Sequence, residues 1–343
     1  MRILITGGAG FVGSNFADFF LKNDSEVLCF DNLYRKGTEK NLEWLKENHK
    51  KNFSFIKGDI RSFDSLKEAS RDVDVIFHTA AQTAVTTSLK DPRNDFEINA
   101  LGTFNLLEAA RQSNTDPIII YTSTNKVYGD NVNAIPLKEK ETRYEFDDEK
   151  FKLGIPEDFS TDADEHTPYG CSKYLGDVYM RDYYKIFGLK TITFRMSCIY
   201  GTRQFGNEDQ GWVVHFIISS IFDKPLTIFG DGKQVRDILF ISDLVNLFDI
   251  AIEKINKIKG QTFNIGGGSK NTCSLLELIQ LIDELTDKKS KITHDDWRPS
   301  DQKVYISNIS KVKKEINWEP EISVKEGVKK LIEWVEKNKN LFS

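Results

Sequence analysis

Cysteine and histidine are scarce in this chain of 343 residues, and neither residue type is clustered. The four cysteines lie far apart and contain no C-x-x-C pair, so we expect neither a disulfide framework nor a zinc site. The five histidines show no i, i+4 spacing of the kind that places two metal ligands on one helix face. We therefore predict no metal centre.

Long apolar runs and an excess of one charge are also missing. No stretch is long enough to span a bilayer, and Met1–Thr6 already has the pattern of a buried strand, which leaves no room for a signal peptide. Lys and Arg number 47 against 52 Asp and Glu, a formal net charge of −5. This balance gives no electrostatic reason to expect nucleic acid or a membrane as partner. We expect a cytoplasmic protein.

Short segments rich in Ile, Val and Phe alternate with helical patterns in the first part of the chain. This alternation is typical of a parallel sheet with helices on both faces, and right-handed crossovers then give a doubly wound α/β (Rossmann) fold. The predicted strands are Arg2–Thr6, Glu26–Asp31, Phe53–Lys57, Val73–His78, Ile118–Ser123 and Thr191–Met196. The predicted helices include Gly13–Lys22, Ser62–Ser70, Asn94–Gln112 and Pro168–Phe187.

The length exceeds that of most single compact units and predicts two domains. We place a Rossmann domain at residues 1–196, with contributions from about 235–265, and a smaller mixed α/β C-terminal domain at 197–343. Residues 130–166 are polar, acidic and irregular, and we expect a surface excursion there. It is either a mobile loop without function or a lid beside the carboxyl edge of the sheet.

A glycine-rich loop follows the first predicted strand, in the sequence I-L-I-T-G-G-A-G-F-V-G. Gly7, Gly10 and Gly13 suit a tight turn, a close approach of backbone to pyrophosphate, and packing of a helix on a strand. The N–H groups of the first helical turn, which includes Phe11 and Val12, are then free to bind phosphate. The spacing is G-x-x-G-x-x-G and predicts a dinucleotide site; the alternative is a plain glycine-rich turn.

One acidic residue ends the second predicted strand, and another follows the third. Asp31 lies roughly twenty residues further on, where a carboxylate accepts a hydrogen bond from the ribose 2′-hydroxyl and repels a 2′-phosphate. This favours NAD over NADP, although Arg35 and Lys36 follow closely. Asp59 is placed to meet the adenine amino group, or it caps a helix.

A possible catalytic pair lies in Y-G-C-S-K, where Tyr169 and Lys173 share one helix face. A free tyrosine has a pKa of about 10, and a nearby ammonium and the positive nicotinamide both lower it. Tyr169 could then take a proton from a substrate alcohol while hydride leaves the adjacent carbon. Thr124 ends the fifth strand, with Ser123 beside it, at the edge where ligands bind in such sheets. The alternative for these hydroxyls is a strand-end turn.

These motifs together resemble the extended short-chain dehydrogenase/reductases, in the subgroup of NAD-dependent epimerases and dehydratases of nucleotide sugars. The resemblance rests on G-x-x-G-x-x-G, S-T-x-x-V-Y-G, Y-x-x-x-K and V-R-D, in this order over nearly the whole chain. Within the subgroup, segments between residues 123 and 304 resemble the CDP-paratose (CDP-tyvelose) 2-epimerases. They are S-T-N-K-V-Y-G-D, E-T-R-Y, P-Y-G-C-S-K, Y-G-T-R-Q-F, D-Q-G-W-V, G-K-Q-V-R-D, F-N-I-G-G and S-D-Q-K-V.

The resemblance implies a tightly held NAD that is reduced and reoxidised within one turnover, and a role in the synthesis of a surface polysaccharide such as lipopolysaccharide O-antigen. It implies that Asn99 supports Lys173; otherwise Asn99 is a solvent-facing helix residue. Thr124, Tyr169 and Lys173 would be catalytic. The predicted cofactor-binding residues are Gly7, Gly10, Phe11, Val12, Asp31, Asn32, Asp59, Ile60, Ala80, Ala81, Gln82, Asn99, Thr122, Tyr169 and Lys173.

The predicted substrate site needs cations for a diphosphate. Arg236 is the foremost candidate because a guanidinium binds two phosphate oxygens, unless it simply pairs with Asp237. The full predicted set is Ser123, Thr124, Asn125, Ser197, Arg203, Gln204, Gln210, Trp212, Arg236 and Arg298. Trp212 could equally belong to the core.

Two departures narrow the chemistry. Sugar 4,6-dehydratases carry Asp-Glu after the catalytic Thr, whereas this chain has Asn125 and Lys126, which cannot serve as that acid–base pair. Ser197 stands where many relatives have Asn, which disfavours the usual contacts of 4-epimerases. The first hypothesis is inversion of carbon 2 of a CDP-linked dideoxyhexose, and the rival is a UDP-hexose 4-epimerase. A net dehydrogenase and a non-catalytic NAD sensor are further alternatives. Relatives also lead us to expect a homo-oligomer.

Overall fold

The computed structural model describes residues 1–298 and 300–342, and the chain forms two compact units. Unit 1 combines Met1–Val127, Thr167–Arg195 and Val245–Phe263; unit 2 combines Tyr128–His166, Met196–Leu244 and Asn264–Ser343. The boundary between residues 195 and 196 lies beside the predicted division. Residues 128–166 group with unit 2 by their contacts. The division into a cofactor domain and a substrate domain stays a prediction.

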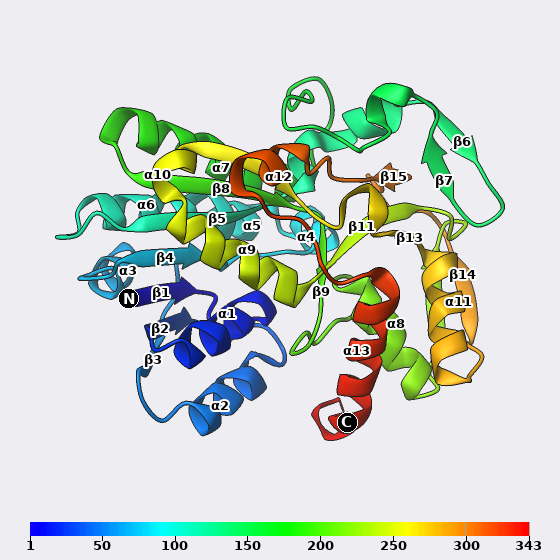
Figure 1. Ribbon diagram of the computed structural model, residues 1–343, viewed down its shortest axis with the longest axis horizontal. Helices are drawn as coiled ribbons and strands as arrows, with labels where there is room; N and C mark the ends of the chain where they lie inside the picture. Colours follow the sequence, from blue (N-terminus) through cyan, green and yellow to red (C-terminus); the bar gives the residue numbers. More distant parts are fainter. Residues whose placement is uncertain (299, 343) are drawn as a thin grey trace. The chain divides into compact units, whose positions relative to one another are not determined.

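The core of unit 1 is a seven-stranded sheet in the order β12-β8-β5-β4-β1-β2-β3 (Figure 1). Neighbouring strands from β3 to β5 pair in parallel. From β1 the chain first adds β2 and β3 on one side of the sheet, and it then returns to add β4 and β5 on the other side. The strand order therefore reverses between β1 and β4, and sheets of this type bind ligands at that point. The strands are β1 Arg2–Thr6, β2 Glu26–Asp31, β3 Phe53–Lys57, β4 Val75–His78, β5 Ile118–Thr124, β8 Lys190–Met196 and β12 Gln261–Ile265.

Helices cover both faces of this sheet. Phe16 of α1 and Phe248 of α9 contact each other and both contact Phe77 of β4. The neighbouring Ile76 points to the opposite face and joins the core beneath α3, α6 and α7. The helices are α1 Phe11–Lys22, α2 Thr38–Asn48, α3 Phe63–Ala69, α4 Val85–Lys90, α5 Pro92–Phe96, the π-helix η1 Glu97–Leu101, α6 Gly102–Arg111, α7 Pro168–Phe187, α9 Ile241–Glu253 and α10 Ile255–Ile258. The doubly wound α/β fold is confirmed.

The ends of α7 follow directly from its sequence. The Thr167 side chain accepts a hydrogen bond from the Gly170 N–H, and Pro168 occupies the first helical position, where its missing N–H has no consequence. Gly188 ends the helix with a φ of 76°, in the left-handed region that favours glycine. These caps fix the register of the helix that carries Tyr169 and Lys173.

Unit 2 is built from short strands and a group of helices. Strand β11 pairs with β9, β13 and β15, while β10 pairs with β14 and β6 pairs with β7. Helices α8, α11 and α13 pack together. The strands are β6 Leu137–Glu139, β7 Tyr144–Phe146, β9 Cys198–Tyr200, β10 Leu226–Phe229, β11 Val235–Phe240, β13 Thr272–Ser274, β14 Ile292–Asp295 and β15 Val304–Tyr305. The helices are α8 Trp212–Ile221, α11 Leu275–Thr286, α12 Ser310–Ile316 and α13 Val324–Lys337, with 3₁₀ turns η2 Asn125–Ala134, η3 Glu149–Phe151, η4 Gly268–Lys270 and η5 Lys339–Leu341.

The expected surface excursion at 130–166 is instead packed into unit 2. Val132, Phe151 and Ile155 are buried, and the Ile155 N–H donates to the Ile306 carbonyl. Widely spaced apolar residues anchor the segment although its composition is polar. Helix α2 was not predicted, because its buried leucines, Leu42 and Leu45, are too few for a clear amphipathic pattern.

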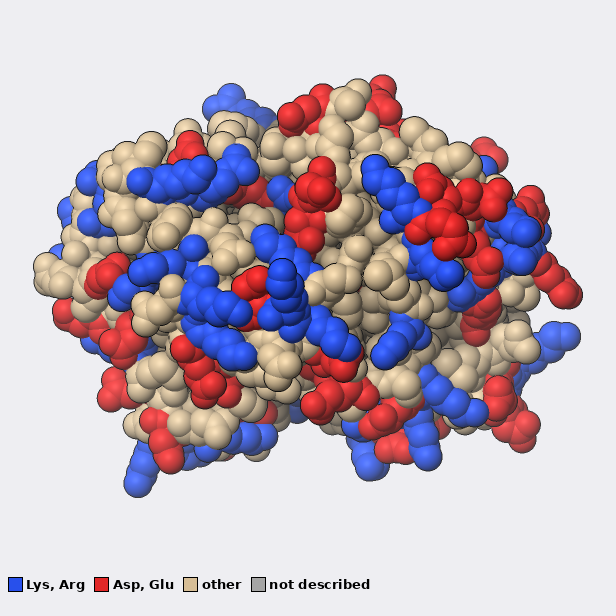
Figure 2. Space-filling view, turned by 45° about the horizontal axis from the view of Figure 1, so that its top comes forward, with Lys and Arg blue, Asp and Glu red and all other residues tan. Residues whose placement is uncertain are grey.

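Charges of both signs are interspersed on the face of the molecule in Figure 2. This mixture matches the small net charge of the chain. Among the helices of residues 1–298 and 300–342, none has the length and apolar character that crossing a membrane requires.

Candidate active site

The glycine loop lies between β1 and α1, against the end of β4. Gly7 has a φ of +70°, and a Cβ atom built there would lie 2.7 Å from the Ala80 backbone nitrogen. At Gly13 an added Cβ would lie 2.3 Å from the Gly7 carbonyl oxygen. Both positions therefore require glycine. Gly10 is the N-cap of α1, and it has no side chain that could cap the helix. The N–H groups of Phe11 and Val12 in the first turn therefore form a helix N-terminus suited to binding an anion.

Asp31 sits at the end of β2 with its carboxylate turned toward this loop. Its two oxygens accept hydrogen bonds from the backbone N–H groups of Ala9, at 3.1 Å, and Leu33, at 2.8 Å. Burial raises the pKa of Asp31, while these backbone donors lower it. Each carboxylate oxygen has two lone pairs, so capacity for a hydroxyl donor remains.

The end of β3 carries a second polar group. Asp59 accepts from Asn32 Nδ2 at 3.0 Å and pairs with the Arg61 guanidinium at 2.8 Å. The bond from Arg61 is the largest cause that holds the pKa of Asp59 at about 2. Ile60 is buried, and the Asn105 side chain of α6 donates to its carbonyl. Asp59 is thus already ion-paired. Its predicted contact with adenine would have to use the lone pairs of the carboxylate that are not bound to Arg61 or Asn32.

Thr124, Tyr169 and Lys173 come together at the end of β5. All three are buried, with exposed fractions of 6%, 9% and 2%. The hydroxyls of Thr124 and Tyr169 share a hydrogen bond, and Lys173 Nζ lies 4.2 Å from the centroid of the Tyr121 ring. Thr122 belongs to the same strand and donates to the His78 carbonyl at 2.9 Å.

Burial sets the acidity of this pair. It raises the pKa of Tyr169 to about 12, against the effect of the bond with Thr124, and lowers the pKa of Lys173 to about 7, against the effect of Asp177 and Asp95. In the protein alone the pKa of Tyr169 is therefore raised, and the lowering expected from Lys173 together with the positive nicotinamide stays a prediction for the protein with NAD bound. The loss of water around the Tyr169 phenol outweighs the effect of Lys173, one turn further along the helix. The spacing of residues in the sequence does not show how deeply each side chain is buried.

Asn99 is 1% exposed, which excludes the solvent-facing alternative. Its Oδ1 accepts from the Gln82 backbone N–H at 2.9 Å, and its Nδ2 donates to the Gln82 carbonyl at 3.0 Å. This reciprocal pair fixes the segment after β4, in which Ala80 and Ala81 are only partly buried.

Sequence reasoning missed two buried acidic residues beside this group. Asp177 forms a 2.7 Å ion pair with Arg195 of β8, and Asp95 binds Ser172. The spacing of Tyr169, Lys173 and Asp177 at i, i+4 and i+8 could have indicated the first. Asp95 had no such signal, because its contacts are made across the fold.

The predicted substrate residues of unit 2 are held by nearby side chains. Arg236 donates to Asp301, at 2.5 Å, and to the Val235 carbonyl, so the alternative of a pair with Asp237 is wrong. Asp237 is buried and accepts from Ser197 Oγ at 2.5 Å. Arg203 lies over the Trp334 ring, and Gln204 is buried beside Gly211. The backbone of Gln210 is hydrogen-bonded to that of Asn207, and Trp212 Nε1 donates to Cys198 Sγ.

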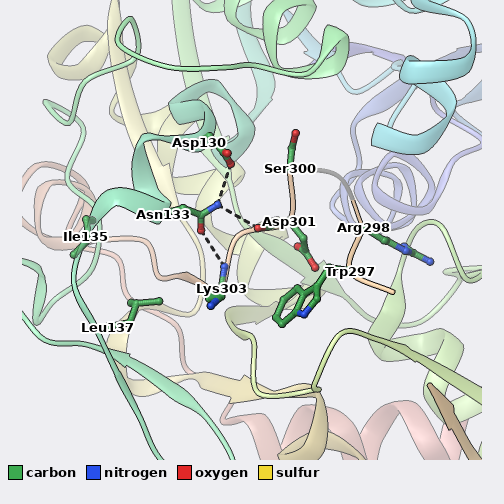
Figure 3. A pocket seen from close by; sticks show the side chains of 9 residues that line it. All are labelled: Asp130, Asn133, Ile135, Leu137, Trp297, Arg298, Ser300, Asp301 and Lys303. Atoms are coloured by element: carbon green, nitrogen blue, oxygen red, sulfur yellow. Dashed lines mark hydrogen bonds between the residues drawn. The ribbon is translucent and has the colours of Figure 1, made fainter. Parts of the chain in front are cut away.

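A pocket of about 510 Å³ opens in unit 2 (Figure 3). Trp297, Arg298 and Lys303 give it an aromatic wall and two cations, and Asp130 and Asp301 add carboxylates. Asn133 links its sides, donating to Asp130 and to the Asp301 carbonyl and accepting from the Lys303 N–H, as the dashed lines in Figure 3 show. Arg298 also stacks on Phe229, 3.9 Å from the ring centroid, and donates to the Glu208 carbonyl.

Fold and site together define an extended short-chain dehydrogenase/reductase, and comparison with known proteins gives the family. The chain belongs to the family described as GDP-mannose 4,6 dehydratase, whose model matches residues 4–331. It is 46% identical over 341 residues to the CDP-paratose 2-epimerase of Salmonella typhi, covering 97% of this chain and 99% of the relative.

Two further similar proteins are 4-epimerases. The UDP-glucuronate 4-epimerase of Thermodesulfobacterium geofontis is 31% identical over 340 residues, covering 98% of this chain and 96% of the relative. The solved structure of the UDP-glucuronic acid 4-epimerase from Bacillus cereus, in complex with UDP-glucuronic acid and NAD, is 30% identical and has a TM-score of 0.82. It covers 98% of this chain and 99% of that chain.

Proposed function

We propose that this protein is an NAD-dependent epimerase that inverts carbon 2 of CDP-paratose or CDP-tyvelose through a transient ketone. The observation that carries the epimerase function is the buried group of Thr124, Tyr169 and Lys173 at the end of β5. The CDP-linked substrate is supported by the 46% identity with a CDP-paratose 2-epimerase.

The residues of unit 1 fit NAD. Gly7 and Gly13 allow the tight turn and close backbone packing of the loop, the N-terminus of α1 follows that loop, and Asp31 offers carboxylate lone pairs for ribose hydroxyls. The solved UDP-glucuronic acid 4-epimerase contains NAD, which supports the same cofactor here. When bound, NAD supplies the acceptor and the donor of hydride.

The protein's own residues then handle the proton. The Tyr169 oxygen takes the proton from the sugar hydroxyl as the carbon is oxidised and returns it when the ketone is reduced on its other face. The Thr124 hydroxyl binds the same sugar oxygen and keeps it beside Tyr169. The ammonium of Lys173 favours the phenolate, which must form against the pKa of about 12 that burial imposes on Tyr169.

Dehydration is not part of this proposal, although the family description names a dehydratase. Asn125 and Lys126 follow Thr124, and an amide and an ammonium cannot act as the acid and base that remove water from the sugar. The second candidate is a 4-epimerase of a UDP-hexose, supported by the similarity to UDP-glucuronate 4-epimerases. A redox sensor would not need the proton-transfer group.

The pocket of unit 2 supplies groups suited to a nucleotide. The Trp297 ring offers a surface for a base, and Arg298 and Lys303 offer charges for phosphate. We assign the nucleotide part of the substrate to this pocket and to Arg236, and we propose Ser197, Arg203, Gln204, Gln210 and Trp212 as further substrate-binding residues of unit 2. The protein would act in the cytoplasm as a homo-oligomer.

The test is incubation of the purified protein, without added NAD, with CDP-paratose, CDP-tyvelose and UDP-glucose in separate samples. NMR of the sugar ring identifies the carbon that inverts. We expect CDP-paratose and CDP-tyvelose to interconvert without net reduction of NAD. Inversion of UDP-glucose alone would favour the 4-epimerase, and conversion of none of the three would overturn the proposed function.

A further inference from the structure

Asp95 is a carboxylate buried inside unit 1 that no step of the proposed mechanism uses. It lies on the short helix α5, directly before the π-helix, and its exposed fraction is 0%. A charged side chain is rarely buried in this way without several polar partners, because removing it from water is costly. The partners of Asp95 therefore indicate what it does.

Three side chains donate to this carboxylate. Ser172 Oγ donates to Oδ2 at 2.6 Å, while Gln82 Nε2 and Asn99 Nδ2 donate to Oδ1 at 2.8 and 3.1 Å. Amide N–H groups can only donate, so Oδ1 carries no proton. The arrangement suits an ionised carboxylate, which forms stronger hydrogen bonds than a neutral acid.

The three donors come from three different parts of the proposed active site. Ser172 lies on α7 between Tyr169 and Lys173, and its hydroxyl also contacts the Tyr169 carbonyl at 3.1 Å. Gln82 belongs to the segment after β4, where we predict contact with the cofactor. Asn99 lies on the π-helix and pairs with the backbone of Gln82. A single carboxylate thus joins α7, the π-helix and the segment after β4.

The charge of Asp95 also reaches the reactive groups. It raises the pKa of Lys173 and that of Tyr169, as a negative charge does for any nearby titratable group. The other titratable or charged groups that face this pair and Asp95 are Cys171 and Asp177 on α7, His78 on β4, Tyr121 on β5 and Arg195 on β8. Of the two carboxylates, Asp177 is already paired with Arg195, whereas the three side chains that donate to Asp95 are neutral.

We propose that Asp95 is a positioning residue for the reaction, holding α7 and the segment after β4 in register and placing a negative charge against Ser172, the residue directly before Lys173. This rests on the proposed roles of Tyr169 and Lys173. The carboxylate acts through Ser172, Gln82 and Asn99 and does not touch the reacting atoms.

Asp95→Asn tests the charge with little change of shape. The new amide can accept from Gln82 and Asn99 and donate to Ser172, whose hydroxyl can then donate to the Tyr169 carbonyl, so the variant should fold. We expect kcat to fall about tenfold with little change in KM. The alkaline limb of the pH profile should move down by about half to one pH unit, because Lys173 loses its proton more easily.

Ser172→Ala tests the link to α7 separately. It keeps the charge of Asp95, so kcat should fall while the alkaline limb stays at its wild-type pH. Asp182→Asn is the matched control, since it removes a carboxylate from the same helix as Tyr169 at a half-exposed position. It should behave as wild type in both measurements.

Hydrogen–deuterium exchange gives a readout that needs no turnover. In Asp95→Asn and Ser172→Ala, peptides covering residues 79–84 should exchange several-fold faster than in wild type, whereas Asp182→Asn should leave them unchanged. Wild-type exchange in both variants would overturn the positioning role, even if no nucleotide sugar is converted. A wild-type pH profile in a folded Asp95→Asn would overturn the electrostatic role. If Asp95→Asn does not fold, unchanged kcat and exchange in Ser172→Ala would still refute the proposal.

Discussion

At the scale of single residues, the reactive groups are defined by burial as much as by chemical type. Tyr169 and Lys173 were evident from their spacing on one helix face, and Thr124 from its place at the end of a strand. Their acidity was not evident. Burial moves the pKa of Tyr169 up to about 12 and that of Lys173 down to about 7, so each group is pushed toward its neutral form. The proposed chemistry needs the charged forms of both groups, so the bound cofactor and substrate have to shift the two pKa values back.

Tyr169→Phe tests the proton transfer directly. The variant should retain NAD, because the ring stays in place, but lose turnover by about two to four orders of magnitude, because the group that accepts the proton is gone. Bound cofactor is measured by its release on denaturation, and turnover by NMR of the sugar. Tyr179→Phe removes the same hydroxyl from the same helix and should be nearly as active as wild type. Near-normal turnover in Tyr169→Phe would remove Tyr169 from the mechanism.

At the scale of elements, β4 carries a histidine that links neighbouring parts of unit 1. His78 Nδ1 lies 2.8 Å from the Thr6 hydroxyl of β1, and Nε2 lies 2.9 Å from the Thr103 hydroxyl of α6. Burial is the largest cause that lowers the pKa of His78 to about 3, and the charge of Lys173 adds to it. The ring is therefore neutral in the folded protein at pH values where an unfolded histidine would be protonated.

This difference predicts loss of stability in acid. The folded pKa lies below the unfolded value of 6.5, so the stabilising contribution is complete above pH 6.5 and is lost as pH falls toward 3. Between pH 7 and pH 5 the free energy of unfolding should drop by about 2 kcal/mol from this group alone.

Urea unfolding of wild type and His78→Gln at both pH values measures this contribution. The variant should be less sensitive to acid over this range, since it has no imidazole to protonate on unfolding. His294→Gln, at an exposed position of unit 2, is the control and should keep the wild-type sensitivity. Equal sensitivity in wild type and His78→Gln would contradict the role of His78.

At the scale of the whole molecule, we expect self-association through unit 1. Large apolar side chains are exposed on its helices: Leu89 on α4, Phe96 on α5, Leu101 on the π-helix, and Ile186 and Phe187 at the end of α7. Exposed apolar groups of this size are often covered by a partner. Sedimentation of the wild type should show a homo-oligomer, and replacing Phe96 and Leu101 by Glu should yield smaller species. Exposed Leu153, in unit 2, gives the control Leu153→Glu, which should sediment as wild type.

The sequence by itself determined the doubly wound fold, the glycine loop and the positions of Thr124, Tyr169 and Lys173. These features depend on residues that are close together in the sequence. Apolar residues repeat every two positions in strands and about every four in helices, and the glycines of the loop have a fixed spacing. Strands β1, β2 and β3 and helix α7 begin and end where the sequence predicts. Helix α2 and the packing of 130–166 were missed because a few widely spaced apolar residues do not make a periodic pattern.

Only the tertiary structure decided what surrounds these residues. Asp95 meets Ser172 and Gln82 across 77 and 13 positions of the chain, and Arg236 meets Asp301 across 65. Such contacts have no local signature, because the fold brings the partners together from separate elements. The same holds for the acidity of Tyr169 and Lys173, since the loss of water that sets it is a property of the packed core and not of the neighbouring residues.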